Sequence, residues 1–202
     1  MPRSLEFCFD YASPYSYFAQ QLVPALTARS GVPVRYRPVL LGGIFKSTGN
    51  QAPMLEGCEP KRHYSVRTLQ RWVAHYDVPF SMNPHFPVNT LGVMRACVAA
   101  QRAGVFDAFH AAVFPAMWSE GRNLGDATEL EDVLERAGLD AKALLGAAQD
   151  STVKQELIAN TEAAVASGAF GVPTFIVRDE DGGEELFWGA DHMHFVERAL
   201  AG

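Results

Sequence analysis

Hydrophobic and polar positions predict two short α/β segments at the ends of the chain, with a long helical stretch between them. Leu5 to Phe9 alternates and carries aromatic residues, which predicts a strand. The run that follows, to about Ser30, predicts a helix that ends at Gly31 and is kinked at Pro24. A second strand is predicted over Val32 to Val39. These elements form a βαβ unit, for which parallel pairing of the strands is expected.

The middle of the chain is predicted to be helical after an initial loop. Leu41 to Pro60, with its paired glycines, is expected to be a loop. Apolar residues then recur at helical spacing, and several of the helices begin after Asp or Asn and end at Gly. Helices are predicted at Tyr64–Tyr76, Thr90–Ala103, Phe106–Trp118 (kinked or ended by Pro115), Glu129–Ala137, from Asp140 to about Ala148, and from Asp150 to about Ser167.

The last part of the chain returns to strands. Thr174–Arg178 and Glu184–Trp188 are expected to form a hairpin, and Gly189-Ala190-Asp191 is expected to cap a final helix, His192–Leu200. The economical fold is a small α/β core, residues 1–44 and 150–202, with an all-helical domain, residues 45–149, inserted into it.

Composition narrows the function classes. The chain has 202 residues and a net charge of -6, and its basic residues do not cluster as nucleic-acid binding requires. No apolar run is long enough to predict a membrane span, and the first residues do not predict a signal peptide. Three separated cysteines and scattered histidines provide neither a dithiol nor a metal site. We therefore expect a cytoplasmic protein with free thiols, no metal, and no nucleic-acid or membrane partner.

Ser13 is the candidate residue that the pattern itself singles out. It precedes Pro14 at the predicted turn from strand to helix, so it suits the N-cap position. Its hydroxyl would lie at the positive end of a helix, which favours an anion. A helix cap is the simplest interpretation, and a ligand contact is compatible with it. A Ser-His-Asp nucleophile is not predicted, because no G-x-S-x-G motif surrounds this serine.

Four stretches of the sequence together carry a family resemblance. In chain order they are Phe9–Tyr17, Lys46–Asn50, Phe86–Leu91 with Arg95 after it, and Phe170–Phe175 with Trp188–Asp191 after it. They resemble the DsbA-like branch of the thioredoxin fold, and within that branch the chain is most similar to kappa-class glutathione transferases and 2-hydroxychromene-2-carboxylate isomerases. A Cys-x-x-Cys pair occupies the corresponding turn in thioredoxin-like proteins, whereas this chain has Ser13 and Ser16, which argues against a dithiol oxidoreductase.

The resemblance implies that glutathione is the cofactor. Ser13 would hydrogen-bond its sulfur and, with the helix N-terminus, hold it as thiolate. Val172, before a cis Pro173, would pair with its cysteinyl part. The γ-glutamyl part would lie against Trp188, Gly189, Ala190 and Asp191, with Asp191 taking the ammonium group. Relatives often carry arginine where this chain has His192.

The resemblance also implies a substrate side of the site. Lys46 and Asn50 would reach an anionic substrate, although both are equally compatible with solvated loop residues. Phe86 would form a wall for an aromatic substrate. Trp118 and His85 could line the same pocket or belong to core and surface.

The implied activity is a glutathione-dependent isomerisation of an aromatic pyruvate-type compound, with ring opening and cis–trans rotation through reversible addition of the thiol. The partners implied are a small aromatic carboxylate substrate and a second copy of the chain in a homodimer. Two alternatives remain: a kappa-like transferase or peroxidase, which consumes glutathione, and a non-catalytic protein that binds a thiol or peptide.

Overall fold

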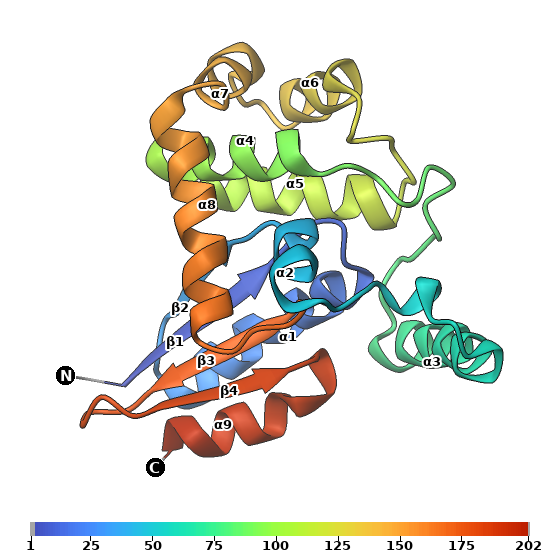
Figure 1. Ribbon diagram of the computed structural model, residues 1–202. Coiled ribbons are helices and arrows are strands. Elements are labelled where there is room, and N and C mark those ends of the chain that lie inside the picture. Colours follow the sequence, from blue (N-terminus) through green and yellow to red (C-terminus); the bar gives the residue numbers. More distant parts are fainter. Residues whose placement is uncertain (1–2, 202) are drawn as a thin grey trace.

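A computed structural model describes residues 3–201, and of Met54 only the backbone. Its four strands form one sheet in the order β2-β1-β3-β4, where the strands are β1 (Ser4–Phe9), β2 (Val34–Pro38), β3 (Thr174–Arg178) and β4 (Glu184–Trp188) (Figure 1). β1 is parallel to β2 and antiparallel to β3, and β3 is antiparallel to β4. Helix α1 (Pro14–Ser30) connects β1 to β2, so the predicted βαβ unit is confirmed.

The helices between β2 and β3 form the insertion, and the predicted α/β fold with a helical insertion is confirmed. The remaining elements are α2 (Leu41–Thr48), η1 (Pro53–Leu55), α3 (Glu59–Tyr76), α4 (Leu91–Arg102), α5 (Phe106–Trp118), α6 (Ala127–Arg136), α7 (Ala141–Ala147), α8 (Ser151–Ala166), η2 (Ala190–His192) and α9 (Met193–Ala201). In Figure 1, α4 to α7 lie above the sheet and α8 runs from that layer down along it.

The larger core covers one face of the sheet and continues into the insertion. Because side chains alternate along a strand, Phe7 and Phe9 point to the same face. Phe7 stacks on Phe175 with ring centroids 4.8 Å apart, and Phe9 meets the ring of His110 at 5.0 Å. Tyr11, just beyond β1, contacts Phe114 of α5 at 4.5 Å. Aromatic packing therefore attaches the start of the chain to the inserted helices.

The other face of the sheet carries a smaller core and a buried carboxylate. Cys8 and Ile176 pack there against residues of α2 and α8. The side chain of Glu6 is 4% exposed and contacts three guanidinium groups, those of Arg35, Arg37 and Arg178. Burial acts to raise the pKa of Glu6, but Arg37 and Arg178 outweigh it and the pKa is lowered.

The segment that follows β2 differs from the prediction, because α2 replaces the first part of the expected loop. Gly42-Gly43 suggested a loop, yet Gly43 has a packing role. A Cβ atom there would lie 3.2 Å from the Cγ2 atom of Thr161 on α8, so glycine lets the two helices approach closely. Ile44 is buried on the same side. Lys46 therefore lies on a helix, and Asn50 lies just beyond its end.

Other helix boundaries also differ in part from the prediction. Neither Pro24 nor Pro115 ends its helix, and α3 begins at Glu59 rather than Tyr64. Asp191 lies inside the η2 turn and makes no side-chain cap, so its predicted capping role is wrong. The predicted caps Asp126, Asp140 and Asp150 each accept a backbone N–H at the start of α6, α7 and α8.

Candidate functional site

Ser13 forms the turn between β1 and α1, and its predicted N-cap role is confirmed. Its backbone is extended, and its Oγ accepts a hydrogen bond from the Ser16 N–H at 3.2 Å. Pro14 occupies the first helical position. The hydroxyl therefore lies at the positive end of a helix of 17 residues. The same hydroxyl donates to the Val172 carbonyl oxygen at 3.1 Å.

The loop before β3 provides the second part of the site. The Val172–Pro173 peptide bond is cis, as the resemblance implied. Val172 is 6% exposed, and its N–H donates to no other described residue. The carbonyl of Pro173 accepts the N–H of Gly189 at 3.0 Å, which attaches the end of β4 to this loop. An extended peptide therefore has a backbone donor available at Val172 and a carbonyl that the Ser13 hydroxyl can release.

The third part of the site is the corner after β4. The Trp188 side chain is exposed and packs on Phe170 with ring centroids 5.0 Å apart. Gly189 has φ +101, and a Cβ atom at that position would overlap Oδ1 of Asp191. Only glycine fits this corner without displacing the carboxylate. The Nδ1 atom of His192 hydrogen-bonds the Trp188 carbonyl, so this histidine supports the corner.

Two tyrosines place Asp191 beside the start of α1. Burial, and after it the charge of Asp191, raise the pKa of Tyr15, two residues beyond Ser13. The same two causes raise the pKa of Tyr76 at the end of α3. The Tyr76 hydroxyl also donates to the Ala190 carbonyl at 3.4 Å. The structure thus brings Asp191 and Ser13, far apart in sequence, to the same end of α1.

The end of α2 adjoins the loop before Val172. Asn50 Nδ2 donates to the Phe170 carbonyl at 2.7 Å. Lys46 is exposed on the last turn of α2, and no ion pair joins it to another described residue. The lysine charge is therefore available to a ligand, whereas the Asn50 amide also has a structural role.

Phe86 is connected to the Ser13 turn through one tryptophan. Phe86 is half-buried and packs against Trp118, with ring centroids 5.8 Å apart. Trp118 is fully buried, and its Nε1–H donates to the carbonyl of Tyr11 at 2.8 Å. Trp118 therefore belongs to the core, while His85 is exposed. The Phe86–Pro87 bond is also cis, which was not predicted.

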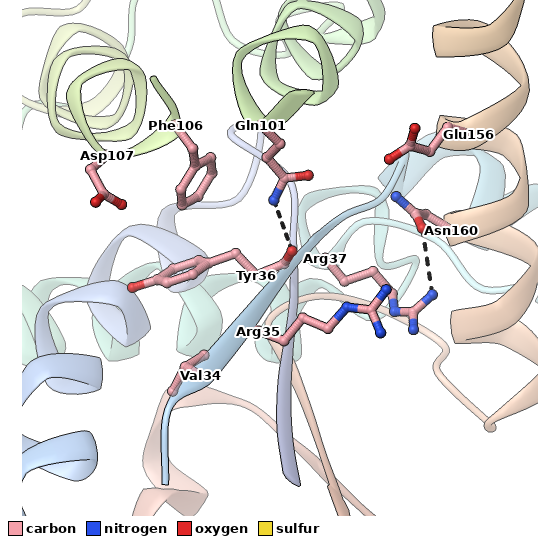
Figure 2. A pocket seen from close by; sticks show the side chains of 9 residues that line it. All are labelled: Val34, Arg35, Tyr36, Arg37, Gln101, Phe106, Asp107, Glu156 and Asn160. Carbon is pink, nitrogen blue, oxygen red and sulfur yellow. Dashed lines mark hydrogen bonds between the residues drawn. The ribbon is translucent and has the colours of Figure 1, made fainter. Parts of the chain in front are cut away.

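Two cavities lie away from the Ser13 turn. One, of about 420 Å³, is lined by His85, Asn89, Asn123 and Asp126 among others. The other, of about 470 Å³, lies at the β2 edge of the sheet (Figure 2). There Gln101 donates to the Tyr36 carbonyl at 2.9 Å, which covers part of the strand edge. Neither cavity is lined by Ser13 or Val172, which are themselves only 4% and 6% exposed.

Two of the chain's three thiols are buried and unreactive. Cys8 and Cys97 are buried, and burial raises the pKa of Cys8 to about 12. Burial likewise raises the pKa of Cys97. Both thiols therefore stay protonated, while Cys58 is exposed. Residues 3–201 contain no cluster of potential ligands that could hold a metal ion, and no helix in that range could cross a membrane.

Comparison with known proteins shows the family of the chain. The model of the DSBA-like thioredoxin domain matches residues 4–201. The chain belongs to this family. It is 31% identical to a 2-hydroxychromene-2-carboxylate isomerase of Sphingobium xenophagum, covering 99% of each chain. It is 30% identical to glutathione S-transferase kappa 1 of Caenorhabditis elegans, covering 99% of this chain and 91% of the other.

Solved structures of the DSBA-like thioredoxin family support the same fold. A 2-hydroxychromene-2-carboxylate isomerase superposes with a TM-score of 0.81 and 28% identity, covering 98% of this chain and 94% of the other. The predicted resemblance to these isomerases and to the kappa transferases is confirmed.

Sequence reasoning gave no role to two residues near the site. Phe170 belongs to a recognised stretch, but its contacts with Trp188 and Asn50 depend on segments distant in sequence. Asp10 stands at the start of the Ser13 stretch and is fully buried. The only sequence signal for Asp10 was its position, an acidic residue directly after the apolar run that forms β1.

Proposed function

We propose that this protein is a glutathione-dependent isomerase of a small aromatic carboxylate of the pyruvate type. The observation that carries the proposal is the position of the Ser13 hydroxyl, at the N-terminus of α1 and within hydrogen-bond distance of the Val172 carbonyl. A hydroxyl donor and a helix N-terminus both stabilise a thiolate. Because Ser13 and Ser16 replace a thiol pair and Cys8 and Cys97 are buried, the reacting sulfur is expected to come from a ligand.

The residues around Ser13 fit the parts of a glutathione molecule. Val172 offers an N–H that no described residue accepts, and the Ser13 hydroxyl can turn from the Val172 carbonyl to a sulfur. Trp188, Gly189, Ala190 and Asp191 would receive the γ-glutamyl end, with the Asp191 carboxylate against the ammonium group. His192 makes a hydrogen bond to the Trp188 carbonyl, so it would act through that corner rather than as a fixed cation.

The substrate would lie on the other side of the Ser13 turn. Lys46 has no ion-pair partner among the described residues and can take a carboxylate as a point charge. Asn50 would place its amide beside it, and Phe86 would provide an apolar wall. Bound glutathione would supply a thiolate that adds reversibly to a conjugated carbon of the substrate and permits rotation about a bond. The chain itself stabilises that thiolate at Ser13 and orients the two ligands.

A kappa-like transferase is the second candidate. The chain is 30% identical to the kappa 1 transferase of Caenorhabditis elegans, nearly the same as its 31% identity to the isomerase of Sphingobium xenophagum. Sequence identity therefore supports a transferase almost as well as an isomerase. A transferase would consume glutathione, whereas an isomerase would release it unchanged. For either activity we expect a homodimer, as the family resemblance implies.

An absorbance assay of 2-hydroxychromene-2-carboxylate, with and without glutathione, tests the proposal. We expect turnover that requires glutathione and leaves the total thiol concentration constant. Loss of thiol with formation of an adduct would favour the transferase. Calorimetry with glutathione alone tests whether the protein binds the proposed cofactor, which both candidate enzymes require. Failure to bind glutathione would exclude that cofactor.

A further inference from the structure

Asp10 is a buried carboxylate that accepts hydrogen bonds from three separate segments. Its side chain is 0% exposed. Oδ1 accepts from the Ala12 N–H at 2.9 Å and from the Thr90 hydroxyl at 2.7 Å. Oδ2 accepts from the Leu41 N–H at 2.8 Å. Both oxygens are therefore occupied, and each donor belongs to a different part of the fold.

Each of these donors belongs to a segment that carries a proposed site residue. Ala12 precedes Ser13 in the turn. Leu41 is the first residue of α2, the helix that ends with Lys46 and leads to Asn50. Thr90 directly precedes α4 and follows the loop that contains Phe86. The cofactor side and the substrate side of the site therefore meet at one carboxylate.

A local turn accounts for only one of these contacts. The bond to Ala12 spans two residues and is an ordinary Asx turn. The bonds to Leu41 and Thr90 span 31 and 80 residues, so a local turn requires neither. No ion pair joins Asp10 to another described residue, so neutral donors alone compensate its burial. Such burial is costly unless the partners are held in place, which makes the three bonds interdependent.

We propose that Asp10 is a positioning residue that holds the Ser13 turn, helix α2 and the Phe86 loop at fixed separations. This inference rests on the proposed function for its consequence in catalysis. Asp10 touches no proposed ligand. It sets the distance between the thiolate site at Ser13 and the carboxylate site at Lys46.

The Asp10→Asn variant tests this role because it alters the acceptor set without changing the size of the side chain. An amide has one oxygen, and its NH₂ group must face a donor. With the oxygen towards Ala12 and Thr90, the NH₂ group meets the Leu41 N–H, so the start of α2 is released. We expect the KM for the carboxylate substrate to rise by about tenfold, with a change below about twofold in glutathione affinity.

Two variants of Thr90 test the same role from the other side. Thr90→Val removes one of the three donors with little change in shape, and kcat/KM should fall by about threefold to tenfold. Thr90→Ser keeps the hydroxyl and should restore kcat/KM to within about twofold of the wild type. Asp126→Asn is the matched control, because Asp126 caps α6 through Thr128 alone. It should leave both kinetic constants unchanged.

Hydrogen exchange on these variants requires no ligand and separates the two proposals. Amides at the start of α2 should exchange at least about tenfold faster in Asp10→Asn than in the wild type, and those of α6 should not change. If exchange in α2 is unaltered in a folded Asp10→Asn protein, the positioning role is wrong, whatever the activity. If exchange changes as expected but the wild type does not bind glutathione, the proposed function fails and the structural connection stands. Turnover by the wild type with unchanged KM in Asp10→Asn and unchanged kcat/KM in Thr90→Val would overturn the catalytic consequence alone.

Discussion

The Ser13 hydroxyl donates a hydrogen bond to the Val172 carbonyl oxygen across 3.1 Å, between residues 159 positions apart. Both groups belong to the proposed cofactor site, and the structure joins them directly. A sulfur anion at this site would have to replace the carbonyl oxygen as the acceptor of the hydroxyl's hydrogen bond. Binding would therefore exchange one hydrogen bond for a stronger, charge-assisted one.

Replacing Ser13 tests whether this hydroxyl serves a ligand. Ser13→Ala should lower kcat/KM by at least about 100-fold, since one donor to a developing or bound anion has this magnitude. It should also lower the free energy of unfolding by about 1 kcal/mol, because the α1 N-cap is lost. Steady-state kinetics and urea unfolding measure the two effects.

Ser16 provides the matched control. Its Oγ is buried and has no hydrogen-bond partner among the described residues, so Ser16→Ala should leave kcat/KM and stability nearly unchanged. If Ser13→Ala loses stability but keeps full activity, Ser13 is only a helix cap.

A cysteine at position 13 would report the electrostatics of the turn directly. In Ser13→Cys, the helix N-terminus should lower the thiol pKa below the usual value of about 8.5. The rate of alkylation as a function of pH gives this pKa. The background should carry Cys58→Ser, because Cys58 is exposed while the other two cysteines are buried. A thiol pKa at or above the usual value would contradict an anion site here.

Glu6 should make the protein sensitive to acid. Its pKa is lowered in the folded state, since Arg37 and Arg178 outweigh burial. Its stabilising contribution is therefore present above the unfolded pKa of 4.5 and is lost as the pH falls through the lowered folded pKa. Glu6→Gln should cost about 3 kcal/mol at neutral pH, because Arg37, whose side chain is 13% exposed, loses its charged partner, and the difference should shrink in acid.

Two comparisons isolate this effect in urea unfolding. Arg35→Ala should cost only about 0 to 1 kcal/mol, because the side chain of Arg35 is 73% exposed. Burial raises the pKa of Asp10, so its stabilising contribution is lost as the pH rises through that pKa, opposite to Glu6. Because both proteins contain Asp10, its contribution cancels in the difference between the unfolding free energies of Glu6→Gln and the wild type. A constant difference at every pH would show that the arginines do not hold Glu6 ionised.

Gly189 should control cofactor affinity through the corner that it shapes. In Gly189→Ala the new Cβ atom would displace the Asp191 carboxylate, so glutathione affinity should fall by about tenfold. Gly182→Ala is the control, since Gly182 also has positive φ but no atom lies within 4 Å of its added Cβ. Both variants bear backbone strain, and calorimetry should show lost affinity only for Gly189→Ala. Equal glutathione affinities in the two variants would show that Asp191 has no part in cofactor binding.

Local chemistry accounts for the features that the sequence could predict. Ser13 before Pro14 and the aspartates before α6, α7 and α8 cap helices through neighbours two or three residues away. The alternation of apolar residues and the aromatic content that located the strands are likewise properties of neighbouring residues. These signals depend on the backbone within one turn, so an isolated stretch contains them.

The remaining features depend on partners distant in sequence. Gly42-Gly43 predicted a loop because glycine disfavours helices, but Gly43 leaves room for the close approach of α2 to Thr161 of α8. Likewise, Asp10 acquires its role from Leu41 and Thr90, which only the folded chain brings to it. The roles proposed for Val172 and Trp188 come from the family resemblance, because no local pattern indicates them.

The aromatic contacts that run from Phe7 through Phe9 and Tyr11 to Phe114 have a consequence for how the molecule melts. They join β1 to α5 without a solvated layer between them, so separating the helices from the sheet would expose several large rings to water. Partial unfolding of either layer is therefore disfavoured. Far-ultraviolet circular dichroism and tryptophan fluorescence should consequently report a single, coincident thermal transition.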